Sequence, residues 1–310
     1  MLKPHDSFQT KAFWAHLSLF AVNALYGASH VLAKGVMPAY LSPSVFILFR
    51  AVGATLFFWL VKFFLPKEKI ARKDWFLLIV CGLFGVTVNQ LFFFHGLNLS
   101  SSINSGIIMA SNPILVVLLS FIILKERFTP RKLVGILLGA VGAILLTLTA
   151  GTGKGDSLLG DLFLFINAAS YAVYLVLVKP LMQKYSPLTV ITYVFTFGSI
   201  FILFYPATLQ EFETTNFHRI PSEVWYKIAY VVVGVTFLTY LLTVFALKYV
   251  TASVSSVYIY LQPVLVMFFA YFLMYLGWSE DFTHTITAQK IGYMLLIFFG
   301  VYLTARRKVG

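Results

Sequence analysis

The chain has 310 residues, of which 60% are hydrophobic and only 11% are charged, and its formal net charge is +12. Its mean hydropathy of +0.88 lies well above the range of soluble domains. This composition excludes a soluble enzyme or a soluble binding module and indicates an all-α membrane protein.

Ten apolar runs follow one another along the chain, and each is close to the roughly 20 residues that cross about 30 Å of hydrocarbon. The runs are 12–33, 43–64, 74–94, 103–124, 132–150, 158–179, 187–206, 223–247, 251–275 and 288–305. The first run is longer than the roughly 7–15 residue core of a cleavable signal peptide, so we expect it to remain as a span. Cys81, the only cysteine, lies inside the third run, which excludes an intramolecular disulfide and a cysteine-rich metal site.

The Lys and Arg residues are distributed unevenly between the connections. If the N-terminus is cytoplasmic, most of them fall on the cytoplasmic side, including the basic clusters at 67–73 and 125–132. This asymmetry follows the positive-inside rule and predicts that both the N- and C-termini are cytoplasmic. The basic excess is therefore a signal of topology, and we expect no nucleic-acid partner.

The two halves of the chain resemble each other. Two pairs of segments align, namely 25–44 with 170–189 and 95–113 with 245–263. We therefore predict ten transmembrane helices in two related five-helix units, residues 1–150 and 151–310. Because five is odd, the second unit enters the membrane from the opposite side, which makes an inverted repeat with a substrate site near the midplane.

Three motifs carry a resemblance to a known family. They are "FRAVGATLFF" in the second run, "GLNLSSSINSGIIMASNPILVVLLSFIILKERFT" through the fourth, and "GILLGAVGAILL" in the fifth. Together they resemble the EamA-type members of the drug/metabolite transporter superfamily, and the resemblance covers nearly the whole chain. The resemblance implies a multi-pass carrier of the bacterial inner membrane, similar to exporters of amino acids or other small metabolites. One departure is that Glu126 follows the fourth run as in the family, whereas Glu280 after the ninth is displaced.

Arg50 is the most informative polar residue inside a run. It lies seven positions after Pro43, roughly 10 Å into the membrane at about 1.5 Å per residue. A charge there costs roughly 2.5–3.5 kcal/mol on insertion scales and marks a functional site by default. Its guanidinium is a candidate for binding an anionic group of the substrate, and the alternative is a structural tie to carbonyl groups of neighbouring helices.

Asn112–Pro113 and Gln262–Pro263 occupy matching positions within the fourth and ninth runs. Proline has no N–H, so each one leaves a backbone acceptor without its helical partner near mid-depth. Such acceptors should face protein or a watery cavity rather than lipid. We predict Pro113 and Pro263 as hinges that shape a cavity wall, with packing kinks as the alternative.

Other polar side chains in or at the ends of the runs complete the predicted substrate-binding set. Besides Arg50, this set contains Tyr26, His30, Asn89, His95, Asn104, Asn112, Tyr171, Tyr174, Tyr240, Ser256, Tyr260 and Gln262. Helical spacing of three or four residues places Asn104 with Asn112, Tyr171 with Tyr174, and Ser256 with Tyr260 on shared faces. Interhelical hydrogen bonding and interfacial anchoring are the alternative roles for all of them, and for Gln90 and Asn167 in the same runs.

The sequence lacks several features that other mechanisms require. No Asp or Glu lies deep in a run, so the usual proton relay of an antiporter is missing, and we expect uncoupled passage down a gradient. No Walker A motif and no catalytic constellation is present, so we expect no ATP-driven transport, no enzyme activity, no cofactor and no metal.

These features predict a carrier that moves a small metabolite, an amino acid or related organic anion, by alternating access. Its expected partners are that solute and the lipid bilayer. A flippase for lipid-linked substrates is the alternative function, and a non-transporting sensor or scaffold ranks last. Gly135, Gly139 and Gly142 form a close-packing face on the fifth run. This face predicts pairing with the tenth run, either between subunits or inside one chain.

Overall fold

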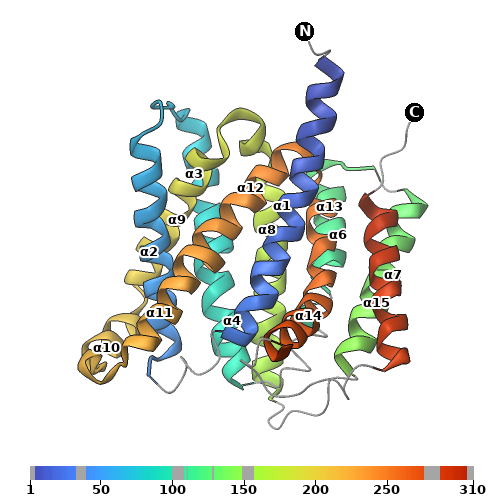
Figure 1. The fold of residues 1–310 in the computed structure, drawn as a ribbon. Helices are drawn as coiled ribbons and strands as arrows, with labels where there is room; N and C mark the ends of the chain where they lie inside the picture. The colour runs from blue at the N-terminus through green and yellow to red at the C-terminus, as the bar shows by residue number, and fades with distance from the viewer. Residues whose placement is uncertain are drawn as a thin grey trace.

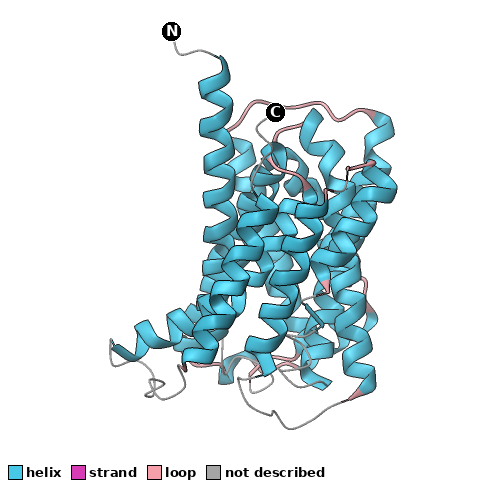
Figure 2. Cartoon of the chain, turned by 90° about the vertical axis from the view of Figure 1, so that its right-hand side faces the viewer, coloured by secondary structure: helices cyan, strands magenta, loops and turns pink. Residues whose placement is uncertain are grey.

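The computed structural model describes residues 4–32, 40–99, 108–109, 111–127, 129–148, 157–275 and 287–305. Within these ranges the chain consists of helices joined by short loops and contains no strand, as Figure 2 shows. The predicted all-α class is therefore confirmed. In Figure 1, α1 begins and α15 ends at the same end of the bundle, which we call the terminal end, and α10 lies at the opposite, distal end.

The first half of the chain contributes seven described helical elements. They are α1 (Pro4–Leu32), α2 (Pro43–Phe63), α3 (Arg72–Gly82), η1 (Leu83–Val88), α4 (Asn89–Leu99), α6 (Asn112–Leu124) and α7 (Pro130–Leu148). The second half contributes the remaining described elements. They are α8 (Leu158–Lys184), α9 (Pro187–Leu203), α10 (Pro206–Thr214), η2 (Phe217–Arg219), α11 (Ser222–Tyr230), η3 (Val231–Leu238), α12 (Thr239–Tyr249), α13 (Ala252–Val257), η4 (Tyr258–Leu261), α14 (Gln262–Tyr275) and α15 (Ala288–Ala305).

Several of these elements are long and apolar enough to cross a membrane. Five described segments meet this test, namely Pro43–Phe63, Arg72–Leu99, Leu158–Lys184, Ser222–Tyr249 and Ala288–Ala305. A sixth is added if α9 and α10, which meet at 71°, count as one span. Shorter apolar helices, Asn112–Leu124 and Ala252–Leu261, occupy two further predicted runs. The chain is therefore a multi-pass membrane protein, and ten spans stay a prediction.

Helices α2 and α9 begin in the same way. Ser42 and Ser186 are their N-caps, and each side chain accepts a hydrogen bond from the N–H three residues later, at 3.4 and 3.3 Å. A proline follows each serine, as is favoured in the first helical turn. Figure 1 shows α2 running toward the terminal end and α9 running toward α10 at the distal end. The two matching helix starts therefore lie at opposite ends of the bundle.

A π-helix interrupts the same long segment in each half, η1 between α3 and α4 and η3 between α11 and α12. In each, a threonine hydroxyl donates to the carbonyl five residues earlier, Thr87 to Gly82 at 3.5 Å and Thr236 to Val231 at 2.8 Å. Such bulges occur frequently at functional sites, because the wider turn redirects side chains and frees carbonyls.

The largest contacts between helices join one half of the chain to the other. Helix α2 packs along α9, and α7 packs along α15. Four further pairs are matched between the halves, since α4 packs on α8 as α12 packs on α1, and α6 packs on α8 as α14 packs on α1. The halves are therefore interleaved rather than stacked as separate bodies.

Glycines allow α7 and α15 to approach closely within one chain. A Cβ at Gly135 would lie 2.4 Å from the Thr304 hydroxyl, and one at Gly300 would lie 2.6 Å from the Gly135 carbonyl. A Cβ at Gly139 would lie 2.4 Å from the ring of Tyr260. The predicted glycine face is thus occupied inside the protomer.

The two predicted hinge prolines stand where a helix begins. Pro113 is the second residue of α6, and Pro263 is the second residue of α14, directly after the 3₁₀ turn η4. A proline fits the first turn without loss of a hydrogen bond, so the chain restarts its helix at these points. The side chain of Pro263 lies outside the described residues.

Candidate functional site

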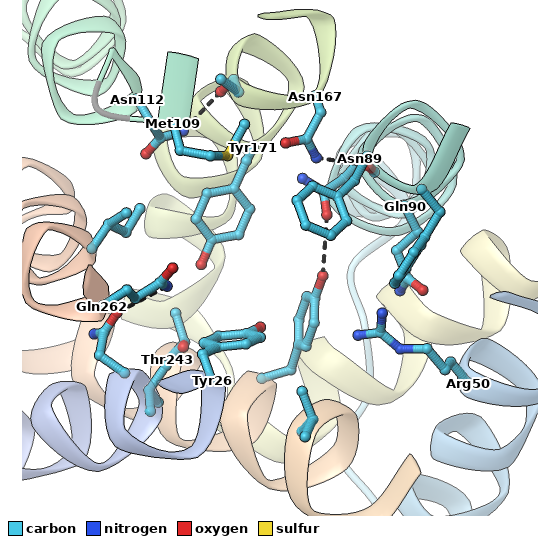
Figure 3. A pocket seen from close by; sticks show the side chains of 18 of the residues that line it. Tyr26, Arg50, Asn89, Gln90, Met109, Asn112, Asn167, Tyr171, Thr243 and Gln262 are labelled. Atoms are coloured by element: carbon cyan, nitrogen blue, oxygen red, sulfur yellow. Dashed lines mark hydrogen bonds between the residues drawn. The ribbon is translucent and has the colours of Figure 1, made fainter. Parts of the chain in front are cut away.

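A cavity of about 380 Å³ lies between the two halves of the chain (Figure 3). Its walls come from α1, α2, α4, α8, η3, α12, α13 and η4, together with the starts of α6 and α14. Seven of the predicted substrate-binding residues line it, namely Tyr26, Arg50, Asn89, Asn112, Tyr171, Tyr240 and Gln262. The cavity therefore brings together residues that are widely separated in the sequence.

The lining residues indicate the depth of the cavity. Phe46 and Arg50 lie in the early turns of α2, and Asn89 to Leu97 lie in α4, which ends at Leu99. Figure 1 places these parts of α2 and α4 in the distal half of the bundle. The cavity thus extends from mid-depth toward the distal end.

Arg50 is the only charged residue among the described residues that line the cavity. It is 7% exposed, and its Nε donates to the hydroxyl of Thr236 at 3.1 Å. The guanidinium carbon lies 4.9 Å from the ring centroid of Phe94, within the range of a cation–π interaction. The described part of the chain offers it no carboxylate, so its positive charge is available to an anion in the cavity.

Three tyrosines contribute aromatic surface and fixed hydroxyls. The Tyr240 hydroxyl donates to the carbonyl of Gly85 in the π-helix η1 at 3.1 Å. The Tyr26 hydroxyl accepts from Thr239 at 3.3 Å. Tyr171 projects into the middle of the cavity in Figure 3. These rings give the cavity an apolar body between its polar groups.

Amide side chains form the other polar part of the wall. Asn112 Nδ2 donates to the carbonyl of Ala168, and Asn167 Nδ2 donates to the carbonyl of Asn89, both at 2.7 Å. Gln262 Nε2 donates to Asn23 Oδ1 at 3.1 Å. Each amide is therefore held by its nitrogen.

Gln90 is buried, and neither polar atom of its amide completes a hydrogen bond among the described residues. Figure 3 shows its amide on the same side of the cavity as the Arg50 guanidinium. A buried amide without partners is costly, so this side of the cavity has donor and acceptor capacity left for a ligand.

Four predicted residues lie elsewhere. The Tyr174 ring packs on Gly85, where a Cβ would lie 2.4 Å from it, and its hydroxyl has no partner among the described residues. Tyr260 packs on Gly139, and the Ser256 hydroxyl donates to the carbonyl of Ser253 at 3.1 Å. His95 Nε2 lies 3.4 Å from the Ser44 hydroxyl, and His95 does not line the cavity.

Two predicted residues cannot be placed. Asn104 and the side chain of His30 lie outside the described residues. Conversely, the cavity includes Asn23, Thr243 and Ser255, which are not among the predicted residues. Asn23 lies one helical turn before Tyr26, and Thr243 lies one turn after Thr239 and Tyr240. Helical spacing around the selected tyrosines was therefore a usable signal for both.

At the terminal end, hydrogen bonds tie the two halves together around α3 and the α8–α9 junction. Asp74 accepts from Lys184 Nζ at 2.8 Å and from the Tyr185 hydroxyl at 2.7 Å. Glu68 accepts from the N–H of Ser186 at 3.1 Å and from its hydroxyl at 3.0 Å. A carboxylate at the N-terminus of α9 is also favoured by the helix dipole.

A second tie joins α6 to α13 at the same end. Glu126 accepts from the Ser253 hydroxyl at 2.8 Å, and Lys132 lies 3.8 Å from the Glu126 carboxylate. Lys179 Nζ donates to the carbonyls of Leu247 and Val250 at the end of α12. Polar contacts thus join the two halves at the terminal end, whereas the cavity lies in the distal half. Within the described part of the chain, no group of three or more His, Cys, Asp or Glu residues is placed to hold a metal ion.

Comparison with known proteins shows similarity to transporters in both halves of the chain. The model of the EamA-like transporter family matches residues 13–148 and 158–306. The uncharacterized transporter YyaM of Bacillus subtilis is 29% identical over 262 residues, which cover 83% of this chain and 85% of the relative. An uncharacterized transporter of Archaeoglobus fulgidus is 27% identical over 77% of this chain and 79% of its own.

A plant protein and a solved structure are also similar. The WAT1-related protein At4g30420 of Arabidopsis thaliana is 28% identical over 59% of this chain and 58% of its own length. A crystal structure superimposes with a TM-score of 0.71 over 93% of this chain and 95% of that chain, at 19% identity, which supports the fold alone. The family match spans both halves of a multi-pass helical chain. The protein is therefore a membrane transporter that belongs to the EamA-like transporter family.

Proposed function

We propose that the cavity is the solute site of a carrier that moves amino acids or related small organic anions across the inner membrane, in the direction of export. The observation that carries the proposal is Arg50, a buried cation in the cavity with no carboxylate partner among the described residues. A guanidinium binds a carboxylate through two parallel hydrogen bonds, which supplies both charge neutralisation and orientation.

We further propose ten spans in two inverted repeats, residues 1–150 and 151–310, with both termini cytoplasmic. The matched helix pairs, the matched π-helices and the capped starts of α2 and α9 at opposite ends support this arrangement. In such a repeat the terminal end is the cytoplasmic end, and the cavity lies on the extracytoplasmic side of the midplane.

Alternating access follows from this arrangement. In the proposed cycle, the ties of Glu68, Asp74 and Glu126 hold the cytoplasmic end closed while the solute exchanges at the distal end. Breaking these ties opens the cytoplasmic end, and the distal end closes in the same step. Pro113 and Pro263, where α6 and α14 restart, serve as hinges. Without an acidic residue in the described cavity wall, transport is driven by the solute gradient alone.

A solute screen tests this proposal. Purified protein in detergent is heated with a panel of amino acids and carboxylates, and solutes that raise the melting temperature are then tested for flux into proteoliposomes. Saturable flux of an anionic or zwitterionic solute that exceeds protein-free vesicles is the expected result. Absence of any protein-dependent solute flux would overturn the proposal, and scrambling of labelled lipid in its place would favour the flippase alternative.

A further inference from the structure

We infer that the wall across the cavity from Arg50 is a hydrogen-bond acceptor subsite that binds a protonated amine, or another strong donor, at the far end of the solute. The inference rests on the proposed function and deepens it, because it specifies a second group that the solute carries. Gln262, which is half-buried, supplies one acceptor, and Asn112 and Asn167, which are 2% and 4% exposed, supply two more.

The orientation of Gln262 is fixed by a relay of hydrogen bonds. The carbonyl of Leu19 can only accept, so the Asn23 Nδ2 that lies 2.7 Å away must donate to it. Asn23 therefore presents Oδ1 to Gln262, whose Nε2 donates to it at 3.1 Å. This arrangement leaves Gln262 Oε1 without a donor among the described residues, and Figure 3 shows the Gln262 side chain reaching toward Tyr171 in the cavity.

The same logic fixes the two asparagines. Asn167 Nδ2 is committed to the carbonyl of Asn89, so its Oδ1 is an acceptor that receives no hydrogen bond within the described chain. Asn112 Nδ2 is committed to the carbonyl of Ala168, and its Oδ1 is buried without a partner. In each of the three amides one N–H donates to the protein, and the amide oxygen receives no hydrogen bond within the described part of the chain. A wall of carbonyl oxygens favours a cationic donor such as an ammonium group.

The two polar regions lie on opposite sides of the cavity. Figure 3 places Arg50 and Gln90 on one side and Asn112 and Gln262 on the other, with the rings of Tyr26 and Tyr171 between them. In an α-amino acid the ammonium and carboxylate share one carbon and cannot reach both sides. The arrangement instead fits a solute that carries an anionic group at one end of a short carbon chain and an amine at the other.

Pairs of probes that differ only in the terminal group test this inference. β-Alanine, γ-aminobutyrate, δ-aminovalerate and ε-aminocaproate are compared with butanoate, pentanoate, hexanoate and heptanoate, in which a methyl replaces the ammonium. Binding to the full-length protein in nanodiscs is measured by calorimetry at pH 7. At the chain length that spans the cavity, we expect the amino compound to bind roughly tenfold to a hundredfold more tightly than its methyl partner. A wall without this subsite would favour the methyl group, because burying an unpaired ammonium is costly.

Variants of Gln262 test whether the preference for the amino compound arises at the acceptor subsite. Gln262→Met is nearly isosteric and should reduce the preference for the amino compound by roughly tenfold, while the affinity for the alkanoate stays within about twofold. Gln262→Glu adds a negative charge and should raise the preference by a similar factor. Gln183→Met, at an exposed glutamine of α8 outside the cavity, is the matched control and should leave both affinities unchanged. Asn167→Leu provides a second test if Gln262→Met does not fold.

The outcomes separate this inference from the proposed function. If the alkanoate binds as tightly as its amino partner at every length, or if Gln262→Met weakens both alike, the acceptor subsite is refuted. If no carboxylate binds, or Arg50→Gln leaves alkanoate affinity unchanged, the proposed anion site fails instead. In that case n-pentylamine, which carries the ammonium alone, still tests the subsite, because its affinity must depend on Gln262.

Discussion

The Nε of Arg50 donates a 3.1 Å hydrogen bond to the hydroxyl of Thr236, and this contact joins α2 in the first half to the π-helix η3 in the second. The hydroxyl donates its own proton to the carbonyl of Val231, so its oxygen is fixed as the acceptor that faces Arg50. The π-helix thereby sets the orientation of the one charged group that the described cavity wall contains.

Removing the Thr236 hydroxyl should weaken anion binding without removing the charge. Thr236→Val is nearly isosteric, and we expect the affinity for hexanoate to fall by roughly threefold to tenfold, because the guanidinium loses the bond that orients it. Calorimetric titration of hexanoate into the wild type and into Thr236→Val measures this difference in affinity. In the Arg50→Gln background the same substitution should have no further effect. If the double variant instead loses hexanoate affinity by the sum of the losses in Thr236→Val and Arg50→Gln, Thr236 acts through general stability rather than through Arg50.

Close packing of α7 and α15 should make one glycine of α15 indispensable and another replaceable. A Cβ at Gly300 would lie 2.6 Å from backbone atoms of Gly135 and Gly139, which cannot yield without moving a helix. We expect Gly300→Ala to cost about 1–3 kcal/mol of unfolding free energy, measured by denaturation in detergent micelles. Gly292 has no atom within 4 Å of a Cβ, so Gly292→Ala is the control and should be neutral or stabilising by about 0.5–1 kcal/mol. Equal effects of the two substitutions would contradict this packing.

The sequence predicted which helices carry the polar groups better than which way each group points. Arg50, Tyr26 and Gln262 line the cavity, because a polar side chain inside an apolar run has few other places to go. Tyr174 lies beside Tyr171, as their spacing predicts, with ring centroids 5.9 Å apart, but its ring enters the space that Gly85 leaves open in the π-helix η1 and does not line the cavity. The spacing of tyrosines within α8 cannot predict that a glycine in another helix leaves room for one of their rings.

The local helix type explains a second difference. Ser256 and Tyr260 were expected to share a face at α-helical spacing, yet Tyr258–Leu261 forms the 3₁₀ turn η4. A 3₁₀ turn has three residues per turn, so the register that an α-helix would give is lost. Helical spacing from Tyr26 could have placed Asn23 at the cavity, but not its hydrogen bond to Gln262, a residue 239 positions away.

The Glu68 tie should make stability depend on pH in a defined direction. Burial alone would raise the pKa of Glu68, but hydrogen bonds from Thr189 and Ser186 and the charge of Lys62 hold it below the ordinary glutamate value of 4.5. A carboxyl whose pKa is lower in the folded state stabilises the fold above its unfolded pKa and loses this contribution as the pH falls through its folded pKa. Its contribution is therefore complete at pH 7.

Glu68→Gln should accordingly lower the unfolding free energy at pH 7 by about 0.5 kcal/mol, a small value because the side chain is partly exposed and screened by solvent. Thermal denaturation of the purified protein between pH 7 and pH 3 measures this difference. We expect the wild type and the variant to converge as the pH falls below 4.5. A difference that stays constant over this range would contradict the role of the ionised carboxylate.

Weakening the Glu126 tie should shift the balance between the two open states. Glu126→Gln removes the charge that holds the Ser253 hydroxyl and Lys132. A cysteine at Ser255, which lines the cavity, reports access to membrane-impermeant maleimide, and the native Cys81 is buried and should contribute little background. We expect labelling from the terminal side to increase and labelling from the distal side to decrease. Unchanged labelling from both sides would contradict a closing role for this tie.

Counterflow in proteoliposomes tests the central claim most directly, namely that the cavity around Arg50 is the solute site of a carrier. Vesicles are loaded with an unlabelled solute from the screen and diluted into a trace of the labelled one. We predict a transient accumulation of label in wild-type vesicles that is lost in Arg50→Gln and retained in Arg72→Gln, an exposed arginine outside the cavity. Accumulation by Arg50→Gln equal to that of the wild type, for an anionic solute, would contradict the account.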